Sequence, residues 1–224
     1  MLKKGSFFMV RIYPSLMAAD PLRLENEIDL LESHCAGFHL DVMDNHFVPN
    51  ITWGANTINA IAQRGKPVWV HLMVEQPDLF YHTLFLPIDS LISFHIEAEI
   101  DVLGFIKIIR EKKHKVSIVI TPKTSLSRIF PFLDAIDQVL LMSVEPGFSG
   151  QLFLKSSLDR LAELAAYRQK HKNVFRIGMD GGIDVANIKT LAEIGVDDCA
   201  IASAIFKHKD RLAALEQLQQ AVML

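Results

Sequence analysis

The chain has 224 residues, a length typical of one domain when the fold is a barrel. Half of the residues are hydrophobic and 22% are charged, which excludes an intrinsically disordered chain. The net charge of −3 provides no broad basic field, so we expect neither nucleic acid nor a membrane as a partner. Two cysteines cannot form a disulfide framework, and no apolar run reaches the roughly 18 residues of a membrane span. These features predict a soluble, cytoplasmic protein.

The N-terminal segment contains two lysines and a short apolar patch. Arg11 ends this patch before it reaches the ~7–15 apolar residues of a signal peptide. We therefore expect residues 1–8 to be an N-terminal extension. No linker or change in composition divides the chain, so we expect a single domain over residues 1–224.

Eight apolar runs of strand length recur along the chain, and segments of helical periodicity separate them. The runs do not alternate cleanly with polar residues, which is typical of parallel strands covered by helices. The predicted strands are Val10–Leu16, Gly37–Met43, Val68–Val74, Ser90–Ile96, Lys115–Thr121, Gln138–Val144, Phe175–Met179 and Asp197–Ala202.

Helix signals occupy the intervals between these strands. Asp20 and Pro21 suit the N-cap and first position of a helix, and Asp184 suits the start of another helix that ends near Gly195. The longest helix is predicted over Leu152–Lys172, with one apolar stripe that contains Leu158, Leu161, Ala162, Leu164 and Ala165.

Eight β-α units in this length predict an α/β fold, the (β/α)8 TIM barrel. The alternative is a doubly wound open sheet, which usually has a glycine-rich nucleotide turn after its first strand. The first predicted strand is followed by Met17-Ala18-Ala19-Asp20, which contains no glycine.

Four candidate metal ligands lie at the C-terminal ends of predicted strands, where such barrels carry their chemistry. His39 and Asp41 share a strand face because they are two residues apart, His71 ends the third strand and Asp180 follows the seventh. Two imidazoles and two carboxylates suit one divalent ion: zinc, iron(II), manganese or cobalt. A single strand histidine is more often a packed core residue, whereas buried carboxylates must be paired, neutralised or bound to metal. On spacing alone, both interpretations stay open.

Small or glycine-rich turns follow the last three predicted strands. Backbone N–H groups in such turns bind phosphate in (β/α)8 barrels, and glycine lets the phosphate approach closely. We therefore expect a small phosphorylated substrate against residues Gly147, Phe148, Ser149, Gly150, Gly181, Gly182, Ala202 and Ser203.

At these residues the chain resembles the ribulose-phosphate 3-epimerase family, from about Ile12 to Phe206. The motifs that carry the resemblance occur in order along nearly the whole chain. They are Pro14-Ser15, Phe38–Asp44, Phe47–Asn50, His71–Val74, Leu141–Val144 with Pro146–Phe148, Asp180–Gly182 and Ser203–Phe206.

The resemblance implies a (β/α)8 barrel that binds one divalent metal through His39, Asp41, His71 and Asp180. It implies that Asp41 and Asp180 are the catalytic acid/base pair, that Ser15 and His71 contact a phosphorylated ketose, and that the protein forms homo-oligomers. It also implies that three methionines line the reaction pocket: Met43, Met73 and Met142.

Several positions depart from the family's usual pattern. Asn45 stands at a common glycine position, Ile96 at a proline and Thr121 at an asparagine. Three further departures lie at the expected phosphate site, where Glu145 replaces an asparagine and Ser149 and Ala202 replace glycines. The departures leave two substrates open, D-ribulose 5-phosphate and a related ketose phosphate such as D-allulose 6-phosphate.

Two other functions compete with epimerisation. A decarboxylase or lyase resembling orotidine-phosphate decarboxylase would have a lysine between two carboxylates after the second strand, whereas Met43 lies between Asp41 and Asp44 here. A sugar-phosphate-binding barrel without catalysis is the second. His95 and Glu97, at the end of the fourth predicted strand, suit either structural support or the pocket.

Overall fold

The computed structural model describes residues 10–223, and the expected extension over residues 1–8 lies outside them. All eight predicted strands are present and run parallel in one sheet, in the order β1-β8-β7-β6-β5-β4-β3-β2. A bridge between Ser15 and His39 joins the first and second strands and closes the barrel. The strands are β1 (Arg11–Pro14), β2 (His39–Met43), β3 (Trp69–Met73), β4 (Leu91–His95), β5 (Lys115–Ile120), β6 (Gln138–Met142), β7 (Arg176–Asp180) and β8 (Asp198–Ile201).

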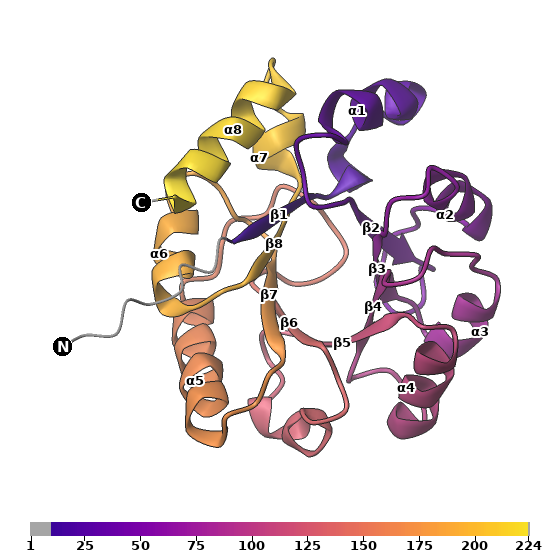
Figure 1. Ribbon diagram of the computed structural model, residues 1–224, viewed down its shortest axis with the longest axis vertical. Coiled ribbons are helices and arrows are strands. Elements are labelled where there is room, and N and C mark those ends of the chain that lie inside the picture. The colour runs from indigo at the N-terminus through magenta and orange to yellow at the C-terminus, as the bar shows by residue number, and fades with distance from the viewer. Residues whose placement is uncertain (1–9, 224) are drawn as a thin grey trace.

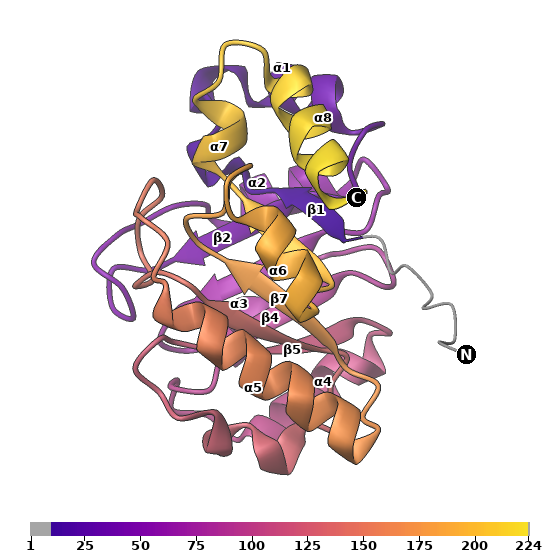
Figure 2. The same ribbon diagram turned by 90° about the vertical axis from the view of Figure 1, so that its left-hand side faces the viewer.

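Helices surround this barrel, so the predicted (β/α)8 fold is confirmed. Figure 1 shows α2, α3 and α4 on one side of the strands and α5, α6 and α8 on the other, and Figure 2 shows α5 and α6 against the outside of the sheet. Between residues 10 and 223, no helix combines the length and apolar character needed to cross a membrane. The helices are α1 (Leu24–Leu31), α2 (Ala55–Ala62), α3 (Pro77–His82), α4 (Val102–Glu111), α5 (Ser156–His171), α6 (Ile188–Ile194), α7 (Ser203–Phe206) and α8 (Arg211–Val222).

The helix boundaries differ from the sequence prediction in three places. The helix predicted to start at Asp184 begins at Ile188. The longest helix begins at Ser156 rather than near residue 152, and Ala162 of its predicted apolar stripe is exposed. The fifth repeat has no α-helix: two short 3₁₀ turns, Leu126–Arg128 and Phe130–Phe132, connect β5 to β6. Pro131 lies in the second turn and cannot continue a helix, because its ring removes the N–H donor.

The barrel interior has an apolar middle and polar ends. Trp69, Val119, Leu140 and Ala200 form the buried apolar layer inside the strands, while the alternate side chains pack outward under the helices. Asp41, His71 and Asp180 take inward positions between this layer and the C-terminal mouth. The polar residues of the site therefore stand on a rigid, packed floor.

Asp198 closes the opposite end of the barrel. Its carboxylate is fully buried and accepts hydrogen bonds from Arg11, Arg176 and Gln138. Burial would raise the pKa of Asp198, but the hydrogen bonds and charges of the two arginines outweigh burial and lower it. The carboxylate is therefore ionised and links β8 to β1, β6 and β7.

We expect Asp198→Asn to lower the free energy of unfolding by about 3 kcal/mol, because it removes one partner of a buried ion-pair network. Since the folded-state pKa lies below the unfolded value, this stabilisation is present above pH ~4 and is lost as the pH falls through the folded-state pKa. Urea unfolding at pH 7 and at pH 3 measures both effects.

Asp29→Asn is the matched control. Asp29 is also paired with an arginine, Arg64, but 58% of its side chain is exposed. Exposed pairs contribute about 0–1 kcal/mol. Equal losses of stability in the two variants would contradict the role of Asp198.

Candidate active site

Asp41 lies on the inner face of β2, just below the C-terminal mouth of the barrel, and is buried. One carboxylate oxygen accepts a hydrogen bond from Ser15 Oγ at 2.6 Å and lies 3.2 Å from His39 Nδ1. The other oxygen lies 3.1 Å from His71 Nδ1. Three polar side chains, from the residue after β1 and from β2 and β3, therefore converge on this carboxylate, as a buried charge requires.

His71 connects Asp41 to the second candidate carboxylate, because its Nδ1 also lies 3.4 Å from Asp180 Oδ2. His39, Asp41, His71 and Asp180 each present one ligand atom, and these four atoms lie within 4.8 Å of one another. His39 Nε2 is buried without a hydrogen-bond partner. Two imidazoles and two carboxylates at this separation fit one divalent ion. The predicted quartet is thus able to bind a metal.

Burial and hydrogen bonding act in opposite directions on the charged groups of the quartet. Burial would raise the pKa of Asp41, but the charge and hydrogen bonds of His39 and His71 outweigh burial and hold this pKa well below its usual value. Burial lowers the pKa of His71, whereas hydrogen bonds to Asp180 and Asp41 raise it, to about 9 overall. Asp41 is therefore ionised at neutral pH, and the cluster attracts positive charge.

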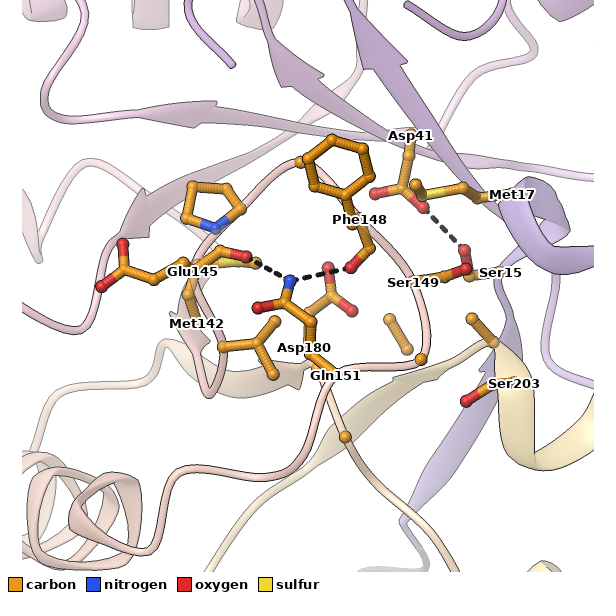
Figure 3. Close-up of a pocket in the computed structure, with 18 of the residues that line it drawn as sticks. Ser15, Met17, Asp41, Met142, Glu145, Phe148, Ser149, Gln151, Asp180 and Ser203 are labelled. Atoms are coloured by element: carbon orange, nitrogen blue, oxygen red, sulfur yellow. Dashed lines mark hydrogen bonds between the residues drawn. The ribbon is translucent and has the colours of Figure 1, made fainter. Parts of the chain in front are cut away.

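A pocket opens above the quartet (Figure 3). Asp41 and Asp180 reach into it, whereas His39 and His71 are fully buried. Apart from His71, every side chain or turn predicted to bind substrate lines this pocket: Ser15, Met43, Met73, Met142, Gly147, Phe148, Ser149, Gly150, Gly181, Gly182, Ala202 and Ser203.

The turns at the far side of the pocket are held in fixed conformations. Gly182 has φ +64°, and a Cβ there would lie 2.4 Å from the backbone N of Phe153. In the loop between β6 and α5, Gln151 Nε2 donates to the carbonyls of Glu145, at 2.7 Å, and Phe148, at 2.9 Å (Figure 3). The glycines of these turns therefore present backbone to a ligand, whereas Phe148 and Ser149 also line the pocket.

The departures from the family pattern have local structural explanations. Glu145 pairs with Lys123 at 2.9 Å, and Figure 3 shows its carboxylate directed away from Asp41 and Asp180. Asn45 adopts φ +60°, a left-handed conformation that asparagine tolerates. Ser149 and Ala202 line the pocket, so their Cβ atoms change its shape.

Six pocket residues were not predicted from the sequence: Met17, Val144, Pro146, Gln151, Ile183 and Ala200. The two-residue period of a strand could have found two of them, because Val144 follows Met142 and Ala200 precedes Ala202 by two positions. Met17 lies two residues after Ser15, in a 3₁₀ turn that the sequence analysis did not predict.

Comparison with known proteins decides the family. The model of the "Ribulose-phosphate 3 epimerase family" matches residues 11–206. The chain belongs to the ribulose-phosphate 3-epimerase family. It is 36% identical to the ribulose-phosphate 3-epimerase of Escherichia coli K12 over 211 residues, which cover 93% of this chain and 94% of that protein. The enzyme of the same name from Serratia marcescens is 39% identical over 202 residues, covering 89% and 96%.

Solved structures show the fold of this epimerase-family chain more broadly. A 3-hexulose-6-phosphate synthase from Salmonella typhimurium matches with a TM-score of 0.70 at 16% identity, over 96% of this chain and 99% of that one. An orotidine 5'-monophosphate decarboxylase from Sulfolobus solfataricus matches with a TM-score of 0.64 at 10% identity, over 96% and 98%. At these identities the likeness concerns the barrel alone, so it does not favour the decarboxylase alternative.

Proposed function

We propose that this epimerase-family protein interconverts D-ribulose 5-phosphate and D-xylulose 5-phosphate. The observation that carries the proposal is the pair of aspartates, Asp41 and Asp180, that meet at His71 Nδ1 beneath a pocket walled by glycine turns. Epimerisation at C3 needs two proton-transferring groups and a site for the phosphate. Two carboxylates that converge at the pocket are needed for proton transfer, whereas binding of a sugar phosphate alone does not require them.

Asp41 and Asp180 divide the proton transfer between the two faces of C3. One carboxylate removes the C3 proton, and the carboxylic acid of the other returns a proton to the opposite face. Ser15 holds Asp41 by its 2.6 Å hydrogen bond, so that the carboxylate keeps one orientation. β2 and β7 are three strands apart around the closed barrel, in the order β2-β1-β8-β7, which brings the two carboxylates to the substrate from different sides.

His39, Asp41, His71 and Asp180 would hold one divalent ion. When bound, this ion supplies a positive charge that stabilises the negative charge developing on the substrate oxygens. Two methionines of the pocket add no competing acid. Met43 and Met73 are buried with Val48 in one apolar cluster, and a thioether excludes water without donating a proton.

The phosphate would lie against the turns at Gly147–Gly150, Gly181-Gly182 and Ala202-Ser203. The ammonium of Lys207 lies beside Gly150, where a Cβ would meet Nζ at 2.9 Å. This cation is exposed and close enough to the loop to favour a dianionic group.

We expect Lys207→Met to raise KM for the sugar phosphate about fivefold with little change in kcat, since an exposed charge contribution of about 1 kcal/mol is removed. Steady-state kinetics at low and high salt measure the effect, which should shrink as salt screens the charge. Lys209→Met is the control because Lys209 lines a different surface pocket. Equal KM values for the two variants would contradict the assignment.

The substrate assignment is tested by comparing kcat/KM for D-ribulose 5-phosphate and D-allulose 6-phosphate in one metal-loaded preparation. The proposal expects the pentulose phosphate to be preferred. Preference for the hexulose phosphate would instead indicate that Ser149 and Ala202 change the substrate specificity of the pocket. Turnover of neither substrate would contradict the epimerase assignment for both.

We also propose that the enzyme works in the cytoplasm as a homo-oligomer. Cys35 and Cys199 are free thiols, which suits a reducing compartment. Three large apolar side chains, Leu79, Phe85 and Ile88, are more than half exposed on α3 and the segment after it. Light scattering of the purified protein tests the assembly, and a monomer at micromolar concentration would contradict it.

A further inference from the structure

A line of contacts continues from His71 away from the pocket. His71 Nε2 lies 2.9 Å from His95 Nε2, and His95 Nδ1 lies 3.3 Å from Glu97 Oε2. Both imidazoles are buried, and only 18% of the Glu97 side chain is exposed. Neither His95 nor Glu97 lines the pocket, so the proposed proton transfer does not use them.

The proton positions along this line are mutually dependent. Two ring nitrogens in contact at 2.9 Å need one donor and one acceptor. If His71 Nδ1 is to bind a metal through its lone pair, the proton of that ring must lie on Nε2. His95 Nε2 must then accept, so its own proton lies on Nδ1, where the Glu97 carboxylate accepts it.

We infer that His95 and Glu97 are positioning residues that fix the metal-binding tautomer of His71 through consecutive hydrogen bonds. This inference rests on the metal centre of the proposed function. Carboxylate–histidine chains behind metal ligands have this effect in many metal sites, because they fix both the tautomer and the ring orientation.

The far end of the line is anchored. The other oxygen of Glu97 accepts hydrogen bonds from the N–H and Oγ1 of Thr121, both at 3.0 Å. Arg160 in turn donates to the Thr121 carbonyl at 3.1 Å. Threonine, which departs from the family's asparagine at this position, thus still supplies a side-chain donor. Glu97 is therefore held as an acceptor toward His95.

The imidazole rings are also fixed by packing. The His71 and His95 rings are nearly parallel, with centroids 5.1 Å apart and planes 20° apart, and they meet edge to edge at their Nε2 atoms. Phe47 covers His95 with a centroid distance of 4.7 Å. Packing alone would hold the rings in place, but it does not select which nitrogen carries the proton. The two explanations therefore make different predictions for side chains of similar size.

The test compares His95→Leu, which removes both hydrogen bonds, with His95→Gln, which keeps one acceptor and one donor. The dissociation constant for Zn²⁺ is measured by competition with a chromogenic chelator. We expect His95→Leu to weaken binding about 10–100-fold, in the range typical of such outer partners. We expect His95→Gln to bind within about fivefold of the unchanged protein. Thermal unfolding of the metal-free proteins reports on folding separately.

Equal zinc affinity in all three proteins, or equal losses in both variants, would overturn the positioning role. If His95→Leu does not fold, nitrogen-detected NMR of the unchanged zinc-loaded protein gives the answer, and protons on His71 Nε2 and His95 Nδ1 are expected. A proton on His71 Nδ1 would overturn the inference. Failure of the unchanged protein to bind zinc would overturn the metal centre itself, a result distinct from zinc binding that is insensitive to residue 95.

Discussion

Asp180→Asn should lower kcat for epimerisation by at least about 10³-fold. The amide cannot take up or return a proton on its face of C3, and general acid–base catalysis alone is worth about 10²–10⁴-fold. Asp180 also approaches His71 in the quartet, so the substitution removes a ligand atom in addition. Steady-state kinetics in both directions measure the loss, and Asp41→Asn should show a loss of the same order.

Asp159→Asn is the matched control for these variants. Asp159 is an exposed aspartate on α5, far in sequence from both strand ends. Its replacement changes the net charge equally and should leave kcat within about twofold, as for surface substitutions that touch no site. An Asp180→Asn enzyme that retains a tenth of the activity would contradict the two-carboxylate mechanism.

Removal of divalent metal by a chelator should abolish epimerisation and lower the unfolding temperature. An ion present at about 1,000 times its dissociation constant stabilises the folded state by about 4 kcal/mol. For a chain of this length, that corresponds to a shift of roughly 10 °C. Activity assays and calorimetry before and after chelation measure both quantities, with zinc, manganese, cobalt and iron(II) added back in turn.

The His39→Gln variant separates the effect of metal binding from the effect of substrate contacts. His39 belongs to the quartet but does not line the pocket, so it would hold the metal without contacting the substrate. Chelation should change its unfolding temperature less than that of the unchanged protein. A chelated, metal-free protein that keeps full activity would contradict the metal centre.

Most of the barrel and its quartet could be predicted because local signals were strong. The ends of β2, β3 and β7 each combine an apolar run with an abrupt histidine or aspartate, and parallel strands bring such ends to one mouth. The absence of an α-helix between β5 and β6 was harder to predict. The apolar residues of this segment, Phe130 and Phe132, are compatible with a helix until Pro131 is taken into account.

Contacts between strands were the harder part to predict. The register pairs His71 with Ser93, and the tilt of neighbouring strands is what brings the His95 ring to His71 Nε2. Likewise, the pairing of Glu145 with Lys123 depends on β5 and β6 being neighbours. The sequence shows which charged residues are present, whereas the pairing and tilt of the strands determine which of them are in contact.

The most direct test of the account is deuterium incorporation at C3 of D-ribulose 5-phosphate in heavy water. The metal-loaded enzyme should exchange the C3 proton at a rate comparable to turnover, with no exchange at C4 or C5, and Asp180→Asn should reduce the rate by at least about 10³-fold. Absence of C3 exchange in protein that holds its metal, or exchange that is unchanged in Asp180→Asn, would contradict the proposed proton transfer between Asp41 and Asp180.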